Sequence, residues 1–297
     1  MFKNYIATPD IRLYSETVML LRSFFLEKGF VEVHTQDRLS ILAACEDPTT
    51  IATYQYAGEV WPLPQTGQMW LEYELLKNPE LSGVFCVSTS FRNEQNPVPG
   101  RHNIIFPMFE FEAKGGIDDL RALEAELMEY LGFGTAAEFS HMDWLDVAKR
   151  YEIEDITSEN EKRLYEEFGS VFFLEHFPEY TSPFWNMART GNIAHKIDVI
   201  VCGMETIGSA ERSSDSKEMR ERFHTISGGG YAKLLYEKFG KERVERELED
   251  FLMLPFFPRF GGGIGLTRLM RACAVLRGSS ADKIAQSTSL FADARSQ

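Results

Sequence analysis

The stretch VFCVSTSFRNEQNPVPGRHNIIFPMFEFEA occupies positions 84 to 113 of the chain. Apolar, β-branched and aromatic residues dominate its two ends, whereas prolines and a glycine interrupt its middle. Residues 84–91 and 104–113 are therefore predicted to be strands, and residues 93–101 the loop between them. Two strands joined in this way form a long antiparallel hairpin.

Helices and further strands are predicted around this hairpin. Residues 15–28 have apolar residues at helical spacing, followed by Gly29 at the position of a C-cap glycine. Residues 118–131 have a second amphipathic pattern, which predicts a helix. Residues 171–174 and 197–202 are predicted to be buried strands. Further helical regions are predicted at 71–76, 141–168, 218–223 and 231–251. Strands without regular strand-helix alternation favour an α+β fold, an antiparallel sheet flanked by helices.

The composition is that of an ordinary globular chain. Of its 297 residues, 44% are apolar and 13% aromatic, enough to bury a sizeable core. No uncharged stretch of about 18 residues and no N-terminal targeting segment is present. We therefore expect a cytoplasmic protein without a membrane partner. The four cysteines are scattered, which predicts neither a disulfide framework nor a zinc site.

The net charge of -14 is spread along the chain. Such a surface repels polyanions on average, and proteins that hold nucleic acid across a wide face usually carry a basic stripe. The cations between positions 220 and 243 are diluted by glutamates, so we interpret them as a solvated helix face. A tRNA partner is therefore not expected.

The predicted hairpin carries residues suited to a nucleotide. Arg92 at the end of one strand can donate two hydrogen bonds to an α-phosphate, and Phe106 on the returning strand can offer an apolar face to a purine. Taken alone, Arg92 and Glu94 could equally form a surface ion pair.

A glycine-rich segment, Gly261 to Gly265, precedes a predicted helix that contains Arg268. Glycines let a backbone approach a ligand closely, and the start of a helix attracts anions. We therefore predict a phosphate-binding turn in which Arg268 faces the terminal phosphate, although a tight packing turn would also explain the glycines.

Two acidic residues flank Gly203. Asp198 and Glu205 could lie at the end of a buried strand and in the turn after it, and share a magnesium ion that bridges phosphates. Two unrelated solvated acids are the alternative.

Together these segments resemble the class II aminoacyl-tRNA synthetases, in the subgroup for aspartate, asparagine and lysine. Residues 15–36 resemble motif 1, the dimer-forming element, residues 84–113 motif 2, and residues 261–277 motif 3. The resemblance spans nearly the whole chain, so residues 1–297 are expected to form one catalytic domain. Residues 132–170 and 216–250 would be helical insertions in it.

The resemblance implies a role for each matching residue. Arg92 and Arg268 would be the catalytic arginines, on the α- and γ-phosphates of ATP. Nucleotide contacts are implied for Arg92, Glu94, His102, Asn103, Phe106, Glu205 and Arg268. Amino-acid contacts are implied for Gln68, Glu72, Glu110 and Arg259. Asp198 and Glu205 would bind Mg²⁺. The expected ligands are thus an amino acid, ATP and Mg²⁺, and a homodimer is expected.

Several positions depart from the family pattern. Gln36 stands in place of the motif 1 proline, Leu71 in place of the lysine of aspartyl enzymes, and Ala210 in place of a serine. The family's side-chain-binding arginine is expected before motif 3, where residues 252–258 are mostly apolar. They predict an apolar pocket, into which Arg259 could bring a charge.

Because the segment that resembles motif 1 begins near residue 15, the family's N-terminal anticodon-binding barrel is not expected. The leading hypothesis is an ATP-dependent ligase that forms an aminoacyl-adenylate and passes the acyl group to a small nucleophile. Ammonia-dependent asparagine synthesis from aspartate is its most specific version. The alternatives are transfer to tRNA, protein or a biosynthetic intermediate, and a non-catalytic nucleotide- or amino-acid-binding regulator.

Overall fold

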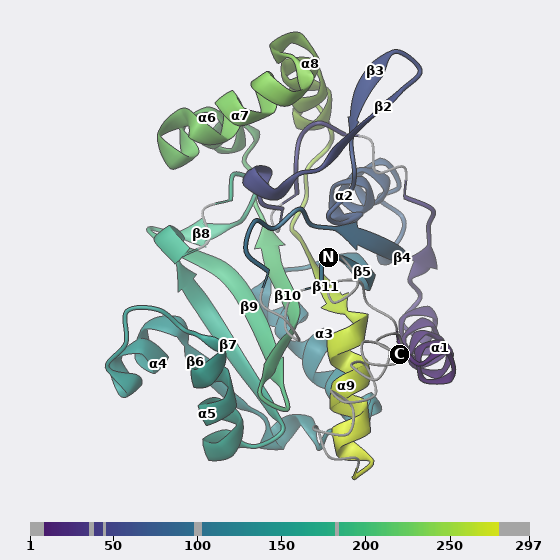
Figure 1. The fold of residues 1–297 in the computed structure, drawn as a ribbon, viewed down its shortest axis with the longest axis vertical. Helices are drawn as coiled ribbons and strands as arrows, with labels where there is room; N and C mark the ends of the chain where they lie inside the picture. Colours follow the sequence, from purple (N-terminus) through teal and green to yellow (C-terminus); the bar gives the residue numbers. More distant parts are fainter. Residues whose placement is uncertain (1–8, 36–38, 44–45, 98–102, 182–183, 279–297) are drawn as a thin grey trace, which may run out of the picture.

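A nine-stranded sheet forms the centre of the molecule in the computed structural model, which describes residues 9–35, 39–43, 46–97, 103–181 and 184–278 (Figure 1). The strand order is β1-β4-β5-β11-β10-β9-β7-β6, with β8 paired to β9. Its strands are β1 (Val31–Glu32), β4 (Gly83–Phe91), β5 (Ile105–Lys114), β6 (Ser140–Asp143), β7 (Val171–Pro178), β8 (Arg189–Thr190), β9 (Ile193–Val201), β10 (Met204–Arg212) and β11 (Arg259–Gly265). The pairs β1/β4 and β6/β7 are parallel and the others antiparallel, so the predicted α+β architecture is confirmed.

The β4–β5 hairpin has the register that the sequence pattern requires, running from Gly83 opposite Ala113 to Phe91 opposite Ile105. Alternate residues of β5 therefore point to opposite faces. Phe109 and Phe111 are fully buried on one face. Residues on the other face include the carboxylates discussed below.

Three helices cover the first face of the sheet, namely α1 (Ile11–Glu27), α3 (Ile117–Tyr130) and α9 (Leu266–Leu276). Their apolar residues share one core cluster with the sheet, exemplified by Leu21, Phe25, Leu120, Leu127, Leu266 and Leu269. Helix α1 begins before the predicted position, because the Asp10 side chain accepts hydrogen bonds from two backbone N–H groups and caps it there.

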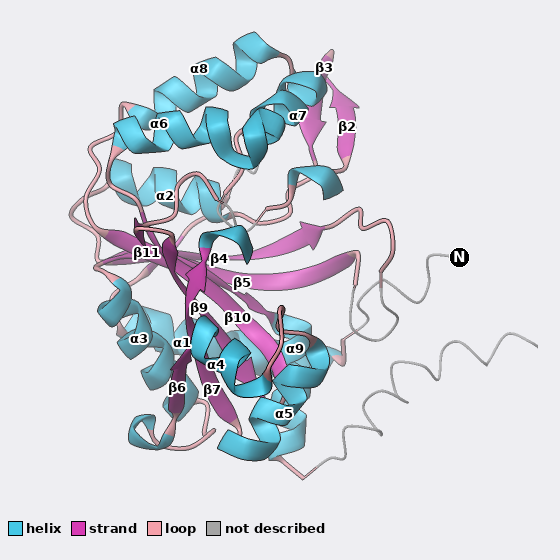
Figure 2. Ribbon diagram, turned by 90° about the vertical axis from the view of Figure 1, so that its left-hand side faces the viewer, coloured by secondary structure: helices cyan, strands magenta, loops and turns pink. Residues whose placement is uncertain are grey.

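A second group of elements lies above the sheet (Figures 1 and 2). It comprises α2 (Gln68–Lys77), the two-stranded hairpin β2 (Thr53–Tyr56) and β3 (Glu59–Pro62), and helices α6 (Ser216–Thr225), α7 (Gly230–Phe239) and α8 (Lys241–Leu252). Trp185 is fully buried among Phe223, Phe251 and neighbouring apolar residues. This second core joins the helical segment 216–250 to the rest of the chain.

The segment before β7 contains helices α4 (Trp144–Tyr151) and α5 (Ser158–Phe168), preceded by β6. Leu164 packs with Phe172 and Val147 in a third cluster. The side of α5 also touches the β9–β10 turn, because the Glu161 carboxylate accepts a hydrogen bond of 3.0 Å from the Glu205 backbone N–H. The short helices were predicted, whereas β6 was not.

Gly261 to Gly265 lie in strand β11 and not in a turn, so the predicted glycine-rich turn is wrong. β11 is paired on both sides, with β5 and β10. A Cβ atom at Gly261 would lie 1.6 Å from Glu112 Oε2, and one at Gly262 would lie 2.6 Å from Ser209 Cβ. The glycines therefore make room for neighbouring side chains in a crowded sheet. Helix α9 follows directly, as predicted.

Candidate active site

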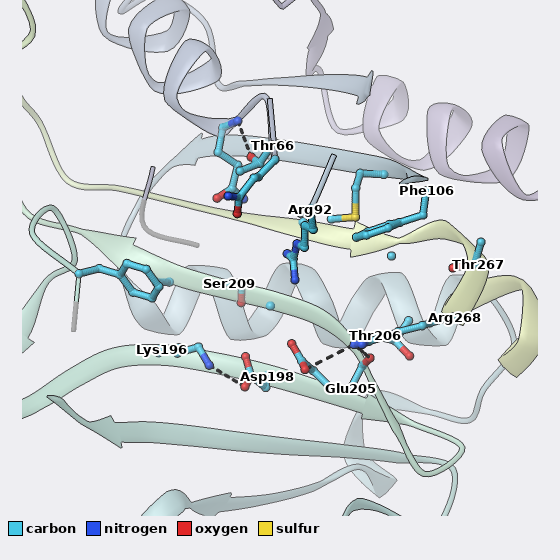
Figure 3. A pocket seen from close by; sticks show the side chains of 18 of the residues that line it. Thr66, Arg92, Phe106, Lys196, Asp198, Glu205, Thr206, Ser209, Thr267 and Arg268 are labelled. Atoms are coloured by element: carbon cyan, nitrogen blue, oxygen red, sulfur yellow. Dashed lines mark hydrogen bonds and ion pairs between the residues drawn. The ribbon is translucent and has the colours of Figure 1, made fainter. Parts of the chain in front are cut away.

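A cavity of about 350 Å³ opens over strands β5, β9, β10 and β11 (Figure 3). Its lining includes Gln65, Thr66, Gln68, Arg92, Glu94, Asn103, Phe106, Met108, Phe184, Met187, Lys196, Asp198, Glu205, Gly208, Arg212, Thr267 and Arg268. Three segments far apart in the sequence, centred on Arg92, Asp198 and Arg268, therefore meet at one site.

One side of the cavity is formed by Arg92 and Phe106 at the loop end of the β4–β5 hairpin. The Arg92 backbone N–H donates to the Ile104 carbonyl, which continues the ladder beyond the last strand pair. The Arg92 guanidinium carbon lies 5.5 Å from the centroid of the Phe106 ring. Its buried Nε has no hydrogen-bond partner among the described residues. A buried donor of this kind can be satisfied by an anion that enters the cavity.

A second arginine stands at the start of α9. Arg268 Nη1 donates to the Glu205 backbone carbonyl over 2.7 Å and approaches Glu205 Oε2 at 3.4 Å. Its side chain is 26% exposed. The free N–H groups at the beginning of a helix favour an anion at this position.

Asp198 and Glu205 face each other across the β9–β10 hairpin. Asp198 lies within β9, opposite Gly208, and Glu205 lies at a register shift in β10. The predicted position at a strand end and following turn is therefore wrong. A Cβ on Gly208 would lie 3.4 Å from Glu205 Oε1 and 3.6 Å from Asp198 Oδ1, so both oxygens flank the space over this glycine.

The acid pair fits the requirements of a hard divalent cation in part. Asp198 Oδ1 is buried without a hydrogen-bond partner among the described residues, and burial raises the pKa of Asp198 above its ordinary value. Within the described ranges no group of three or more His, Cys, Asp or Glu side chains could hold a metal ion. The protein therefore offers two carboxylates, and phosphate oxygens and water would complete the coordination of Mg²⁺.

The opposite side of the cavity is polar. Arg212 Nη2 donates to Gln68 Oε1 over 3.1 Å, and Arg212 Nε donates to Glu112 Oε1 over 3.0 Å. Burial raises the pKa of Glu112, and Arg212 opposes that rise. This end of the cavity therefore presents the Arg212 guanidinium and the Gln68 side chain, whereas the fully buried Glu112 holds Arg212 without lining the cavity.

The sequence pattern described as tRNA synthetases class II (D, K and N) matches residues 3–279. The chain belongs to this family. Among the curated proteins, this synthetase-family chain is 24% identical over 283 residues to an aspartate--tRNA(Asp) ligase from Pyrobaculum aerophilum, covering 85% of the chain and 61% of that protein. An asparagine--tRNA ligase from Pelotomaculum thermopropionicum is 25% identical, over 90% of the chain and 66% of that protein. The chain thus spans less than two thirds of these relatives' length.

Solved structures show the same fold. The class II synthetase chain superposes on asparaginyl-tRNA synthetase from Pyrococcus horikoshii, complexed with asparaginyl-adenylate, with a TM-score of 0.73 and 22% identity. The match covers 90% of the chain and 65% of that structure. An asparaginyl-tRNA synthetase from Entamoeba histolytica gives a TM-score of 0.69.

Eight of the residues singled out by their resemblance to synthetases line the cavity. They are Gln68, Arg92, Glu94, Asn103, Phe106, Asp198, Glu205 and Arg268. His102 lies outside the described residues. The other three, Glu72, Glu110 and Arg259, lie behind the wall and do not line the cavity.

Glu110 supports the turn that carries Gln68. Its Oε2 accepts a hydrogen bond of 2.8 Å from the Gly67 backbone N–H, and the Ser88 hydroxyl also donates to it. Glu110 is fully buried. Glu110 therefore supports a wall of the cavity, whereas the resemblance implied a direct amino-acid contact.

Glu72 and Arg259 form a buried ion pair behind Arg212. Arg259 Nη2 donates to Glu72 Oε2 over 2.6 Å, and Asn186 Nδ2 donates to Glu72 Oε1 over 2.8 Å. Both partners of the pair are fully buried. The predicted entry of Arg259 into the amino-acid pocket is not seen, because the carboxylate of Glu72 holds it.

The residues that line the cavity are not those of the apolar pocket that the sequence predicted. Residues 252–258 do not line the cavity, whereas Arg212 on β10 brings an arginine into it. Arg212 alternates with Gly208 and Ala210 on one face of β10. If residues 204–212 had been predicted as a strand, this alternation would have placed Arg212 on the cavity face. Lys196, two positions before Asp198, was also missed.

Proposed function

We propose that the chain is an ATP- and Mg²⁺-dependent ligase that activates an amino acid as its adenylate. One observation carries the proposal, namely that a single cavity holds two arginines and an acid pair at one end and Arg212 with Gln68 at the other. The first set suits phosphates and the second suits an amino acid. The class II fold supports it, and so do the relatives, which are named as amino acid--tRNA ligases.

In the proposed reaction an oxygen of the amino-acid carboxylate attacks the α-phosphorus of ATP. A C–O–P linkage forms, the bond between the α-phosphorus and the bridging oxygen breaks, and pyrophosphate leaves. Arg92 binds the α-phosphate and Phe106 stacks on adenine, while Arg268 leaves Glu205 for the γ-phosphate. Positioning and neutralisation of the phosphate charge lower the barrier.

Asp198 and Glu205 would hold Mg²⁺, which neutralises charge on the phosphates when it is bound. Gln68 is proposed to orient the α-ammonium, and Arg212, held by Glu112, to face the side chain. Glu94 and Asn103, which line the nucleotide end, are proposed to steady ATP. With the ammonium and the side chain of the amino acid placed in this way, its α-carboxylate points towards Arg92.

For the second half-reaction we propose a small nucleophile. In the most specific version the activated carboxylate is that of the aspartate side chain, which then lies at Arg92, while the α-carboxylate lies towards Arg212. Ammonia attacks the acyl carbon of this side-chain adenylate and loses a proton, and AMP leaves as asparagine forms. Transfer to tRNA is the second candidate, because the relatives' names specify tRNA. Against it, the cations near the end of the chain face carboxylates, as in the pairs Arg220–Glu249 and Arg243–Glu247.

A homodimer is proposed on the apolar surface of α1 and β1. Ile11, Met19, Leu26 and Val31 are between 41% and 81% exposed. A second copy would cover them, which light scattering at several protein concentrations tests. A catalytically silent regulator is disfavoured, because it would not need Arg92, Arg268 and the acid pair together.

The amide-forming version is tested by incubating the full chain with aspartate, ATP, Mg²⁺ and ammonium chloride. The proposal predicts asparagine and AMP in equal amounts. Arg92→Ala should abolish both products, whereas Arg220→Ala, a surface variant outside the cavity, should not. AMP released without asparagine would reject ammonia as the acceptor, and ATP left intact with every amino acid would reject the activity.

A further inference from the structure

Lys196 is a charged residue of the cavity that the proposed chemistry does not use. It lies on β9 two residues before Asp198, so both side chains point to the same face of the strand. Its Nζ donates to Asp198 Oδ2 over 2.6 Å (Figure 3). The same Nζ lies 3.8 Å from the centroid of the Phe177 ring. The Lys196 side chain is only 16% exposed.

The two carboxylates assigned to Mg²⁺ are thus each faced by a fixed cation. Lys196 binds Asp198, and Arg268 approaches Glu205 at 3.4 Å. A divalent ion that enters the empty cavity meets an acid pair whose charge is already balanced. It is also repelled by the Lys196 ammonium, which is poorly screened because it is largely buried.

The two oxygens of Asp198 differ in their surroundings. Oδ2 is held by Lys196, whereas Oδ1 has no hydrogen-bond partner among the described residues and lies beside Gly208. Asp198 can therefore offer one oxygen to a metal ion while the lysine retains the other. Such a site is too weakly charged to gather a divalent cation by itself, and the phosphates of ATP supply the missing negative charge.

We propose that Lys196 is a built-in cation that keeps the nucleotide-free acid pair from binding a divalent metal ion, so that the metal is admitted only together with nucleotide phosphates. The inference rests on the proposed function of the same cavity. It assigns Lys196 as a positioning residue that holds Asp198, and it makes a prediction about the protein without ATP.

The test is titration of the nucleotide-free full chain with Mn²⁺ alone, followed by electron paramagnetic resonance of the free ion. Lys196→Met should bind Mn²⁺ about tenfold more tightly than the unmodified chain, because the repelling charge is removed. Lys196→Arg keeps the charge and should bind as weakly as the unmodified chain. The double variant Lys196→Met with Asp198→Asn should lose the gain, which places the ion at Asp198.

Equal Mn²⁺ affinity in the unmodified chain and in Lys196→Met would overturn the inference. A gain that survives in the double variant would also overturn it, since the ion would then lie elsewhere. Circular dichroism checks that each variant is folded, and Lys196→Gln replaces the methionine variant if that one does not fold. Pyrophosphate exchange tests the proposed function separately, so a failure there is distinguishable from a failure here.

Discussion

Glu72 and Arg259 are 187 positions apart in the chain and form an ion pair from which solvent is fully excluded. Arg259 also donates to the Ser213 carbonyl, and Asn186 donates to Glu72. The pair joins α2 to the start of β11, directly behind Arg212. Its geometry connects the stability of the fold to the shape of the amino-acid end of the cavity.

Breaking this pair from one side should be strongly destabilising. Arg259→Met leaves the buried Glu72 carboxylate without its closest cation and with only the Arg212 Nε at 3.6 Å, which we expect to cost about 3–5 kcal/mol of unfolding free energy. The double variant with Glu72→Leu should recover much of that loss, because neither partner of the pair is then left buried without the other, and Arg212 keeps its pairing with Glu112. Urea unfolding of the three proteins measures both effects, and a loss below about 1 kcal/mol in Arg259→Met would contradict the assignment.

Leu71 occupies the position of a lysine in aspartyl enzymes, and it is fully buried against Leu75, Val84 and Cys86. Leu71→Lys should therefore bury an unpaired ammonium at a cost of several kcal/mol, on the order of that for other buried charges. Leu71→Met is the matched control and should cost less than about 1.5 kcal/mol. Full stability of Leu71→Lys together with activation of aspartate would show instead that the lysine reaches a substrate carboxylate.

Glu124 on α3 is fully buried, and neither carboxylate oxygen has a hydrogen-bond partner in the described part of the chain. Burial raises the pKa of Glu124 well above its ordinary value, and the nearby Asp198 and Glu175 raise it further. As pH rises above about 4.5, the unfolded chain loses this proton while the folded chain keeps it. Stability should therefore fall with rising pH.

Glu124→Gln removes this titration and should flatten the pH dependence, by up to about 1.4 kcal/mol per pH unit. Urea unfolding between pH 5 and pH 8 measures it. The control is Glu126→Gln, an exposed position on the same helix, which should leave the slope nearly unchanged. The same slope in Glu124→Gln as in the unmodified chain would show that Glu124 is not protonated in the fold.

Arg268→Ala should abolish activation while the fold remains intact. Its side chain is partly exposed and hydrogen-bonds to Glu205 in the described part of the chain, so its loss removes little packing. We expect the rate of pyrophosphate exchange to fall about 100-fold or more, as for other residues that stabilise developing charge. Thermal unfolding within about 3 °C of the unmodified chain is the control. Retained exchange would reject the role of Arg268.

The sequence predicted the elements whose patterns are local. The β4–β5 hairpin, α1, α3 and α9 follow from apolar periodicity and from turn residues between them. Strand β11 was missed because glycines at 261–263 indicate a turn locally, whereas their cause is the close approach of Glu112, Ser209 and Met108 from neighbouring strands. That crowding is a property of the assembled sheet.

The site shows the same division. Arg92, Phe106, Asp198 and Arg268 were identified because each has a chemical role that its residue type suggests, and the fold brings them to one cavity. Arg259 was placed wrongly because its partner Glu72 lies far away in the sequence. Lys196 was missed because a lysine two residues from an aspartate indicates a contact only if both lie in a strand, whose alternation places the two side chains on one face.

Every role proposed for the cavity depends on the formation of an aminoacyl-adenylate in it. Amino-acid-dependent exchange of labelled pyrophosphate into ATP tests it most directly, with Mg²⁺ present, with tRNA and ammonia absent, and with all twenty amino acids and common non-proteinogenic ones tried. We expect exchange of pyrophosphate with one amino acid, and we expect Arg268→Ala to abolish that exchange. Exchange with none, by a folded protein that binds ATP, would contradict it.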